Sequence, residues 1–373
     1  MKRFNKDEAE KEKIFFNDIF EDITRFCKKI NQAEYLVKGE FPIIDQGKNK
    51  IAGFSYLKNE VYRDTPVIIF GDHTRVIKFI DFPFLIGADG VKVLKNRREE
   101  FLDKYLYYAL KYFKIPNTGY NRHFKWLKEF YIYSSNIETQ KKIVKILDII
   151  QELIEIKNKK LKELDNLSKC LFVEMFGDPI LNEKNWSKKS YEEMSTLITD
   201  GEHQTPKRIE RGIYLLSARN IYNHHLKLED VDYITEEEYI RISKRIVPKE
   251  NDILISCSGS IGRVCLVPKN LKFQLVRSVA LIRVKENINP IFMEYLIASD
   301  FTQNQIKKET TKSSQANLFQ GKIKKLVGII PPIELQNKFA ERIKLIEKSK
   351  FEIQKSIDET QKLFDSLMDK YFG

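Results

Sequence analysis

Hydrophobic residues recur with helical spacing in two long segments, 137–177 and 333–373, where core positions alternate by four and three residues. Such a heptad pattern keeps one stripe of a helix facing a partner helix. Eight of the ten core positions are apolar in each segment. We therefore predict two long helices that pair along an apolar seam. The seam residues are Ile143, Leu147, Ile150, Ile154, Leu161, Leu164, Phe339, Ile343, Ile346, Ile353, Ile357 and Phe364.

The two segments are also copies of each other. Shifted by 196 residues, they align without a gap and share 11 identities among 41 pairs, where chance would give about three. Each copy ends on Phe-Gly, at Phe176-Gly177 and Phe372-Gly373. The alignment continues upstream, where 126–140 overlies 322–336 and both stretches indicate a last strand, a turn and the helix. The repeated unit is therefore a domain followed by a helix, and not a helix that merely packs on its own domain.

Between the helices, short β-branched or aromatic runs such as VIIFG (67–71) and ILISC (253–257) are interrupted by Gly, Asp, Asn and Pro. This pattern predicts an α/β (α+β) class with irregular sheets. Because each helix starts where a domain ends, we expect antiparallel helices that hold two related domains apart. The predicted organisation is a charged N-terminal arm (1–16) with no match in the second repeat, domain one (17–136), helix one (137–177), a linker (178–184), domain two (185–332) and helix two (333–373).

The charge balance suggests a polyanionic partner. Lys and Arg number 65 against 53 Asp and Glu, which gives a net charge of +12; a lysine-rich genome would produce the same excess, so composition alone does not decide. No apolar run approaches the ~20 residues of a membrane span, and the N-terminal stretch does not resemble a signal peptide. We expect a cytoplasmic protein with no membrane partner. The four cysteines are too widely spread for a disulfide framework and are expected to be reduced thiols.

Motifs of catalysis are missing from the sequence. It lacks the N-P-P-[FY] or D-P-P-[FY] of amino-methyltransferases, the phosphate loop, the dinucleotide fingerprint and H-E-x-x-H. His224 and His225 have no acidic or cysteine partners at metal spacing, which favours a surface loop over a metal site. We predict a non-catalytic chain without a metal. Two alternatives stay open at this point: a coiled-coil scaffold whose domains bind proteins, and a nuclease or methyltransferase in its own right.

Loops of both domains mix cations with amide and aromatic side chains, the types that hold phosphates and read base edges. Domain one offers HTRVIK (73–78) and TGYNRHFKW (118–126), and domain two offers RNIYNHHLKL (219–228) and TTKSSQANLFQGKIKK (310–325). Solvated loops have a similar composition, but here such loops occur twice on a duplicated scaffold. The candidate DNA-binding residues are Arg75, Lys78, Arg122, Lys125, Arg219, Asn220, Arg263, Lys312 and Gln315.

The chain resembles the specificity (S) subunits of type I restriction-modification systems over nearly its whole length. FPIIDQGKNKIAGF (41–54) and VIIFGDHTRVIKFIDFPFLIGADGVKVL (67–94) resemble a target recognition domain, and IETQKKIVKILDIIQELI (137–154) resembles the helix that follows it. In the second half, ILISCSGSIGRVCLV (253–267) and the stretch 313–343 resemble another such domain and helix. The order domain, helix, domain, helix is more specific than any single motif.

This resemblance implies a DNA-reading subunit in which each target recognition domain recognises one half of a bipartite, asymmetric site in double-stranded DNA. Two modification (M) subunits, bound along the helices and their seam residues, would methylate adenines. Restriction (R) subunits, where present, would add translocation and cleavage. The resemblance places S-adenosylmethionine, ATP and Mg in those partner subunits, and no cofactor in this chain.

Overall fold

The computed structural model describes residues 12–119, 121–311 and 317–373. The chain forms two compact units: residues 1–157 with 356–373, and residues 158–355. Each unit contains one mixed α/β domain and parts of both long helices, α4 (Ile137–Phe176) and α10 (Ile333–Phe372). The predicted fold class, a duplicated α/β domain with two long helices, is confirmed.

Domain one contains two four-stranded sheets. The first has the order β2 (Phe20–Asp22), β9 (Val91–Asn96), β6 (Val67–Gly71), β7 (Ile77–Ile80), and its pairs are antiparallel. The second has the order β3 (Lys29–Ile30), β8 (Leu85–Gly87), β4 (Phe41–Ile44), β5 (Gly53–Ser55), and β8 pairs in parallel with both β3 and β4. The helices α2 (Asp103–Tyr112) and α3 (Phe124–Leu127) follow. Strand β6 is buried along its whole length, which accounts for its uninterrupted apolar sequence.

Domain two repeats this topology. Its main sheet has the order β12 (Ser195–Asp200), β20 (Val279–Val284), β17 (Ile253–Ser256), β18 (Val264–Leu266). The other sheet pairs β13 (Ile213–Leu216) in parallel with β19 (Phe273–Leu275) and antiparallel with β16 (Asp232–Ile234). The helices α7 (Pro290–Ala298), α8 (Asp300–Thr311) and α9 (Gln320–Lys325) complete it.

Domain two contains elements that domain one lacks, among them helix α8 between α7 and α9. The hairpin β14 (Ile221–Tyr222) and β15 (His225–Leu226) lies between β13 and β16, and helix α6 (Glu236–Ser243) lies between β16 and β17. These insertions make domain two the longer copy. They explain why the sequence repeat is clear only at the helical ends.

The structure corrects the prediction that the first sixteen residues match nothing in the second repeat. Strand β1 (Lys13–Phe15) pairs with β10 (Tyr131–Tyr133), and the four-residue helix α1 (Phe16–Ile19) follows. Domain two has the same arrangement: β11 (Ser187–Ser190) pairs with β21 (Val327–Ile330), and the four-residue helix α5 (Tyr191–Met194) follows β11. The starts of the two domains are not 196 residues apart, unlike the long helices. An alignment at the fixed offset of 196 therefore could not reveal that β1 and α1 correspond to β11 and α5. Residues 1–11 lie outside the described part of the chain.

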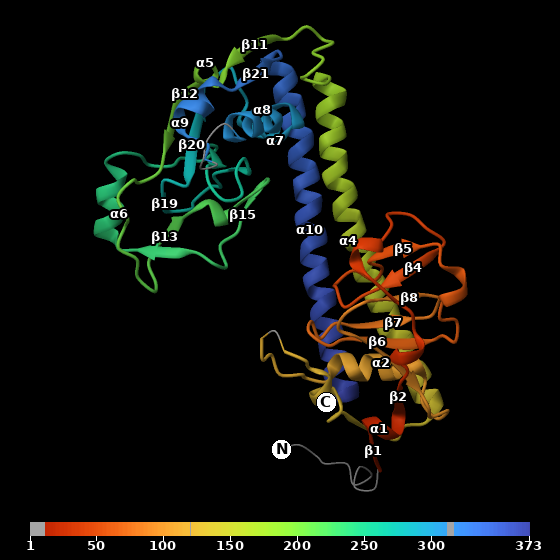
Figure 1. The fold of residues 1–373 in the computed structure, drawn as a ribbon. Coiled ribbons are helices and arrows are strands. Elements are labelled where there is room, and N and C mark those ends of the chain that lie inside the picture. The colour runs from red at the N-terminus through yellow and green to blue at the C-terminus, as the bar shows by residue number, and fades with distance from the viewer. Residues whose placement is uncertain (1–11, 120, 312–316) are drawn as a thin grey trace. The chain divides into compact units, whose positions relative to one another are not determined.

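The two long helices run side by side in opposite directions within each unit (Figure 1). In the first unit Leu147 of α4 belongs to the same core as Phe364 and Met368 of α10. In the second, Phe172 and Phe176 of α4 contact Phe339 near the start of α10, with ring centroids 5.7 and 5.2 Å apart. All twelve seam residues are buried or half-buried, as helix pairing along this stripe requires.

Polar seam positions also pair across the helices. In the first unit the Lys157 ammonium donates hydrogen bonds to the hydroxyls of Ser356 (2.8 Å) and Thr360 (2.7 Å). In the second unit the Lys350 ammonium lies 2.7 Å from Asp165. A half-buried ammonium is costly without acceptors, so these contacts favour one alignment of the helices over a shifted one.

A buried glutamine in the first turn of each long helix joins that helix to its domain. The Gln140 amide donates to the carbonyls of Glu100 and Ser135 (both 2.8 Å), and its carbonyl accepts from the Leu102 amide at the start of α2 (2.9 Å). Gln336 does the same in domain two, with the Pro331 carbonyl (2.8 Å) and the Asn289 amide at the start of α7 (2.8 Å). Both glutamines are fully buried, so the junction is built identically twice.

We predict that Gln140→Leu destabilises the first unit, because an apolar side chain of similar size leaves the Leu102 amide and two carbonyls unpaired. Each buried unpaired group costs roughly 1–3 kcal/mol. Hydrogen exchange followed by mass spectrometry should show faster exchange at the start of α2.

Gln361→Leu, at an exposed position of α10, is the matched control and should leave exchange unchanged. Equal protection of α2 in both variants would contradict the proposed role of Gln140.

Candidate nucleic-acid interface

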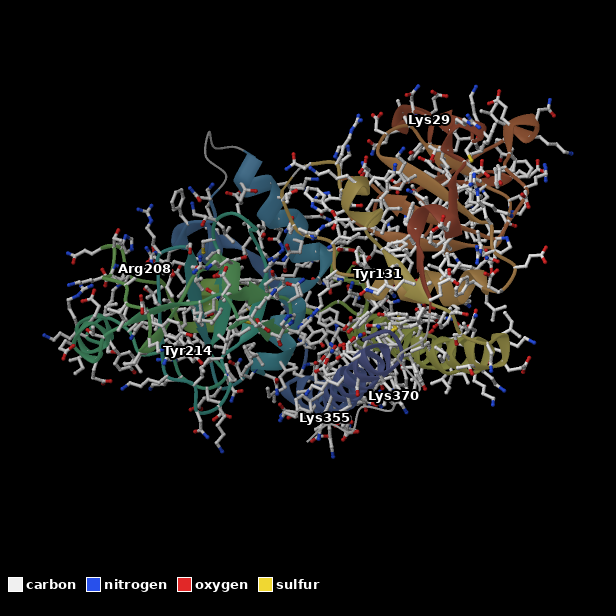
Figure 2. The ribbon with its side chains drawn as sticks, turned by 90° about the horizontal axis from the view of Figure 1, so that it is seen from below. Lys29, Tyr131, Arg208, Tyr214, Lys355 and Lys370 are labelled. Carbon is white, nitrogen blue, oxygen red and sulfur yellow. The ribbon has the colours of Figure 1, made fainter. Side chains whose placement is uncertain are left out.

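Charge alone does not locate a binding face. Figure 2 shows side-chain nitrogens, drawn in blue, spread around both domains, with Lys29 and Arg208 among the labelled residues. The topology is more informative, because ligands of sheets with parallel strands bind where those strands end. We call the turns that follow the parallel strands β4 and β8 in domain one, and β13 and β19 in domain two, the carboxyl edge of each domain.

The carboxyl edges of the two domains share one backbone frame. In domain one the Asp72 amide donates to the Gly90 carbonyl (2.7 Å), and the His123 amide donates to the Asp72 carbonyl (2.8 Å). In domain two the Cys257 amide donates to the Ser278 carbonyl (2.8 Å), and the Leu318 amide donates to the Cys257 carbonyl (2.9 Å). The β6–β7 and β17–β18 turns, and the loops that lead to α3 and α9, therefore meet at the same point in each copy.

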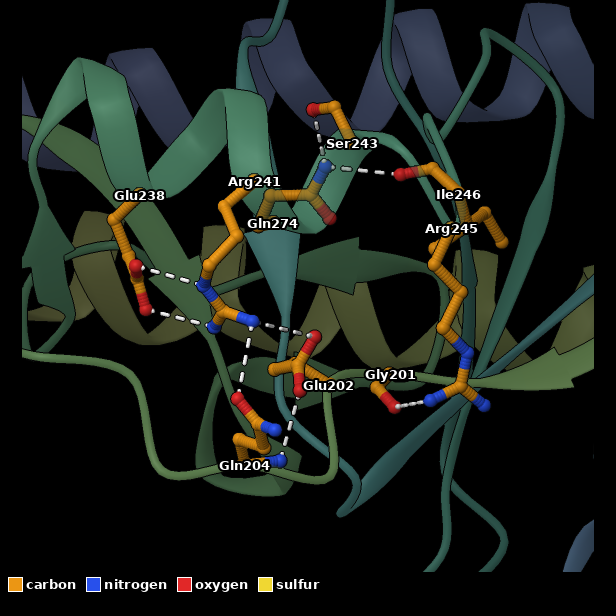
Figure 3. A network of polar contacts seen from close by, with 9 residues as sticks. All are labelled: Gly201, Glu202, Gln204, Glu238, Arg241, Ser243, Arg245, Ile246 and Gln274. Atoms are coloured by element: carbon orange, nitrogen blue, oxygen red, sulfur yellow. Dashed lines mark hydrogen bonds and ion pairs between the residues drawn. The ribbon is translucent and has the colours of Figure 1, made fainter.

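A network of polar contacts supports the edge of domain two (Figure 3). The Arg241 guanidinium binds both carboxylate oxygens of Glu238 (2.9 and 2.8 Å) and lies 3.7 Å from Glu202. Arg245 donates to the Gly201 carbonyl (3.2 Å) and pairs with Asp200 (2.7 Å). The inserted helix α6 and the residues after it thus fix the segment that follows β12.

Gly201 is required at this point by close packing. A Cβ atom on it would lie 2.5 Å from the carbonyl oxygens of Leu275 and Val276. Its neighbour Glu202 bridges to Val276, and the Gln274 amide holds the adjacent strand through Ser243 (2.8 Å) and the Ile246 carbonyl (3.0 Å). The turn after β19 is therefore fixed from both sides.

Two of the candidate DNA-binding residues have buried side chains. The Lys78 ammonium is enclosed by the carbonyls of Asp45 (2.7 Å) and Asn49 (2.6 Å), and burial lowers its pKa although Asp45 acts in the opposite direction. Asn220 is 1% exposed, and its amide donates to the carbonyls of Lys227 (3.0 Å) and Asp230 (2.8 Å). Both side chains hold their own loops together through these hydrogen bonds.

The other candidates within the described residues are exposed or half-buried, and their positive charges are paired to differing degrees. Arg75 is half-buried, has left-handed backbone (φ 61°) and donates to the Ile115 carbonyl (3.2 Å). Arg122 and Lys125 are exposed, and the Lys125 ammonium lies over the Trp126 ring.

In domain two Arg219 is paired with Asp232 (2.9 Å), so its charge is partly compensated. The Arg263 guanidinium instead stacks on Tyr222, 4.5 Å from the ring centroid. Lys312 and Gln315 lie outside the described residues. Whether any of these residues touches DNA stays a prediction.

Sequence reasoning missed two exposed residues of the carboxyl edges, Asp89 and Arg277. They lie in the three-residue turns after β8 and β19. No signal in the sequence singles them out, because their equivalence appears only once the strands are paired. Arg277 is the more conspicuous of the two, since the part of the chain that the structure describes holds no ion-pair partner for it.

The described residues contain no group of three or more His, Cys, Asp or Glu side chains that could hold a metal ion. All four cysteines are free thiols, and burial raises the pKa of Cys257 to about 12. Within the same described ranges, no helix has the length and hydropathy needed to cross a bilayer.

Comparison with known proteins identifies the duplicated architecture. The family model of the type I restriction modification DNA specificity domain matches residues 8–166 and 183–361. The chain belongs to this family. It is a specificity subunit, a non-catalytic component that recognises DNA sequence, and its two matched segments each include one α/β domain.

Individual relatives are distant but cover most of the chain. The MjaVIII specificity subunit of Methanocaldococcus jannaschii is 22% identical over 363 residues, covering 83% of each chain. The EcoR124I/EcoR124II specificity subunit of Escherichia coli is 23% identical and covers 62% of each chain. The solved S subunit from M. genitalium covers 100% of this chain and 98% of its own, with 15% identity and a TM-score of 0.63. The last likeness is one of fold.

We predict that Gly201→Ala lowers the free energy of unfolding of the specificity subunit, because the new methyl group displaces the segment after β12 from the β19–β20 turn. Overpacking of this kind costs roughly 1–3 kcal/mol, and DNA binding that depends on domain two should fall with it. Denaturant unfolding and a DNA-binding titration measure the two effects.

Gly321→Ala is the control, because a Cβ there meets nothing within 4 Å and alanine is the better helix former. Equal stability of the two variants would show that the close approach at Gly201 does not require glycine for stability.

Proposed function

We propose that the two domains read the two unlike halves of a bipartite, asymmetric site in double-stranded DNA, and that this chain thereby directs adenine methylation by partner subunits. One observation carries the proposal: the same carboxyl edge is built twice on one backbone frame, with different exposed side chains. A shared frame gives both domains the same way of approaching a duplex. Different side chains on that frame give each domain its own sequence preference.

The proposed partners are two M subunits, with R subunits where a system includes them. S-adenosylmethionine, ATP and Mg would belong to those subunits. One solved chain of similar fold comes from work on complex assembly of the type I R-M system; it covers 97% of this chain with a TM-score of 0.52. We extend such assembly to this protein as part of the proposal.

The seam residues do not suit the contact to an M subunit that we assigned to them, because the paired helix already covers them. A second stripe of α4 is the better candidate. Its residues are spaced by three and four positions and are 39–56% exposed: Ile146, Ile149, Leu153 and Ile156. An exposed heptad stripe is the surface that a further helix packs against. We therefore propose this stripe as an M-subunit contact.

We predict that the chain, co-expressed with its M subunit, produces N6-methyladenine within one two-part motif that has a fixed unread gap. Replacing residues 1–136 with the corresponding part of a related subunit should change one half of the motif only. Long-read sequencing of the host genome measures both. The exchanged segment includes β1, because that strand belongs to domain one.

Binding to the wild-type site should weaken steeply with salt, since counterion release accompanies phosphate contact. Methylation that does not depend on this chain, or binding without sequence preference, would favour the scaffold reading. Methyl transfer by the chain alone would favour an enzyme.

We also predict that the double variant Ile149→Lys and Leu153→Lys retains less M subunit during co-purification, because two ammonium groups would enter an apolar contact. Val37→Lys, at a position in domain one that is 91% exposed, is the matched control. Full retention of M subunit by the double variant would exclude this stripe as the contact.

A further inference from the structure

Asp89 and Arg277 occupy the same position in the two domains. The turns Ala88–Gly90 and Val276–Ser278 each join a parallel strand to the strand that enters the main sheet, β9 or β20. The carbonyl of the turn's last residue, Gly90 or Ser278, accepts the equivalent hydrogen bond described above. The middle residue of the turn is therefore a carboxylate in one copy and a guanidinium in the other.

Both turns hold this middle residue firmly. Gly90 has a φ of 66°, and a Cβ there would lie 2.7 Å from Gln46 and His73, so only glycine fits after Asp89. The Arg277 amide donates to the Glu202 carbonyl (3.0 Å), and the Val279 amide closes the turn onto the Val276 carbonyl (3.0 Å). Reading a base requires a side chain presented from a rigid frame, and these turns provide one.

Both side chains are exposed, and no ion pair engages either of them among the described residues. The neighbouring charges on the edge of domain two are already paired: Asp200 with Arg245, and Glu202 with Arg241. Among the described residues, Arg277 is thus an uncompensated cation on this edge. It can donate two parallel hydrogen bonds to a ligand without breaking an existing contact.

Asp89 gives the stronger argument, because a carboxylate cannot bind the phosphate backbone. An exposed acid on a DNA-binding edge is repelled by phosphates. Its favourable partner in the major groove is an exocyclic amino group, and aspartate accepts from N4 of cytosine. Arginine at the equivalent place binds O6 and N7 of guanine.

We propose that Asp89 and Arg277 are equivalent base-reading residues, that Arg277 specifies a guanine in the half-site of domain two, and that Asp89 specifies a cytosine in the half-site of domain one. This inference rests on the proposed function, because it requires each domain to read one half of the target.

The test uses the full chain co-expressed with its M subunit, and the readout is the fraction of each sequence variant of the motif that carries N6-methyladenine. Arg277→Ala should lose the preference for guanine at one position of one half-site, by roughly five- to 150-fold, while every other position keeps its preference. Asp89→Asn should lose the preference for cytosine in the other half-site and gain tolerance for adenine, which asparagine can bind.

Lys269→Ala and Glu99→Ala, at exposed positions outside these turns, are the matched controls and should leave the motif unchanged. Co-purification of the M subunit verifies that each variant assembles. A wild-type methylome without a two-part motif would overturn the proposed function itself. A wild-type motif that Arg277→Ala and Asp89→Asn leave unchanged, or weaken equally at all sequences, would overturn the base-reading assignment alone.

Discussion

The buried glutamine in the first turn of each long helix is the contact on which the attachment of each domain depends. Gln140 pairs with the Ser135 carbonyl in the turn before its helix and with the Glu100 carbonyl and the Leu102 amide at the start of α2. Gln336 pairs with the Pro331 carbonyl before its helix and with the Asn289 amide at the start of α7. A side chain that donates and accepts in a fully buried site has few acceptable orientations. Each domain is consequently fixed to its own helix, and a ligand held by the domain has a defined position along that helix.

Because the domains are duplicated, they share one backbone frame. They differ mainly in insertions and in exposed side chains outside the shared core. The order of strands in the main sheet and the hydrogen bonds at the carboxyl edge are the same in both copies. The differences include the inserted hairpin β14–β15, the helices α6 and α8, and the exposed side chains of the turns. Changing an exposed turn residue costs little stability, which is why specificity can change on this fold without loss of the core.

The helices and the duplication were predictable from the sequence because their signal is periodic and local. The heptad stripe alone assigned all twelve seam residues to positions that prove buried or half-buried. The DNA-binding candidates were less predictable, because a loop's composition does not reveal which of its side chains point inward. Lys78 and Asn220 were chosen for their chemistry, and the fold uses that same chemistry to satisfy buried carbonyls.

The sequence by itself thus determined the class of the protein, its internal repeat and the pairing stripe of its helices. Only the tertiary structure decided that β1 belongs to domain one, that a second stripe of α4 is exposed, and that Asp89 and Arg277 are equivalent. The physical reason is that each of these facts depends on hydrogen bonds or packing between residues distant in the chain, such as Phe15 with Tyr131 and Asp72 with Gly90. Local periodicity carries no information about such pairs.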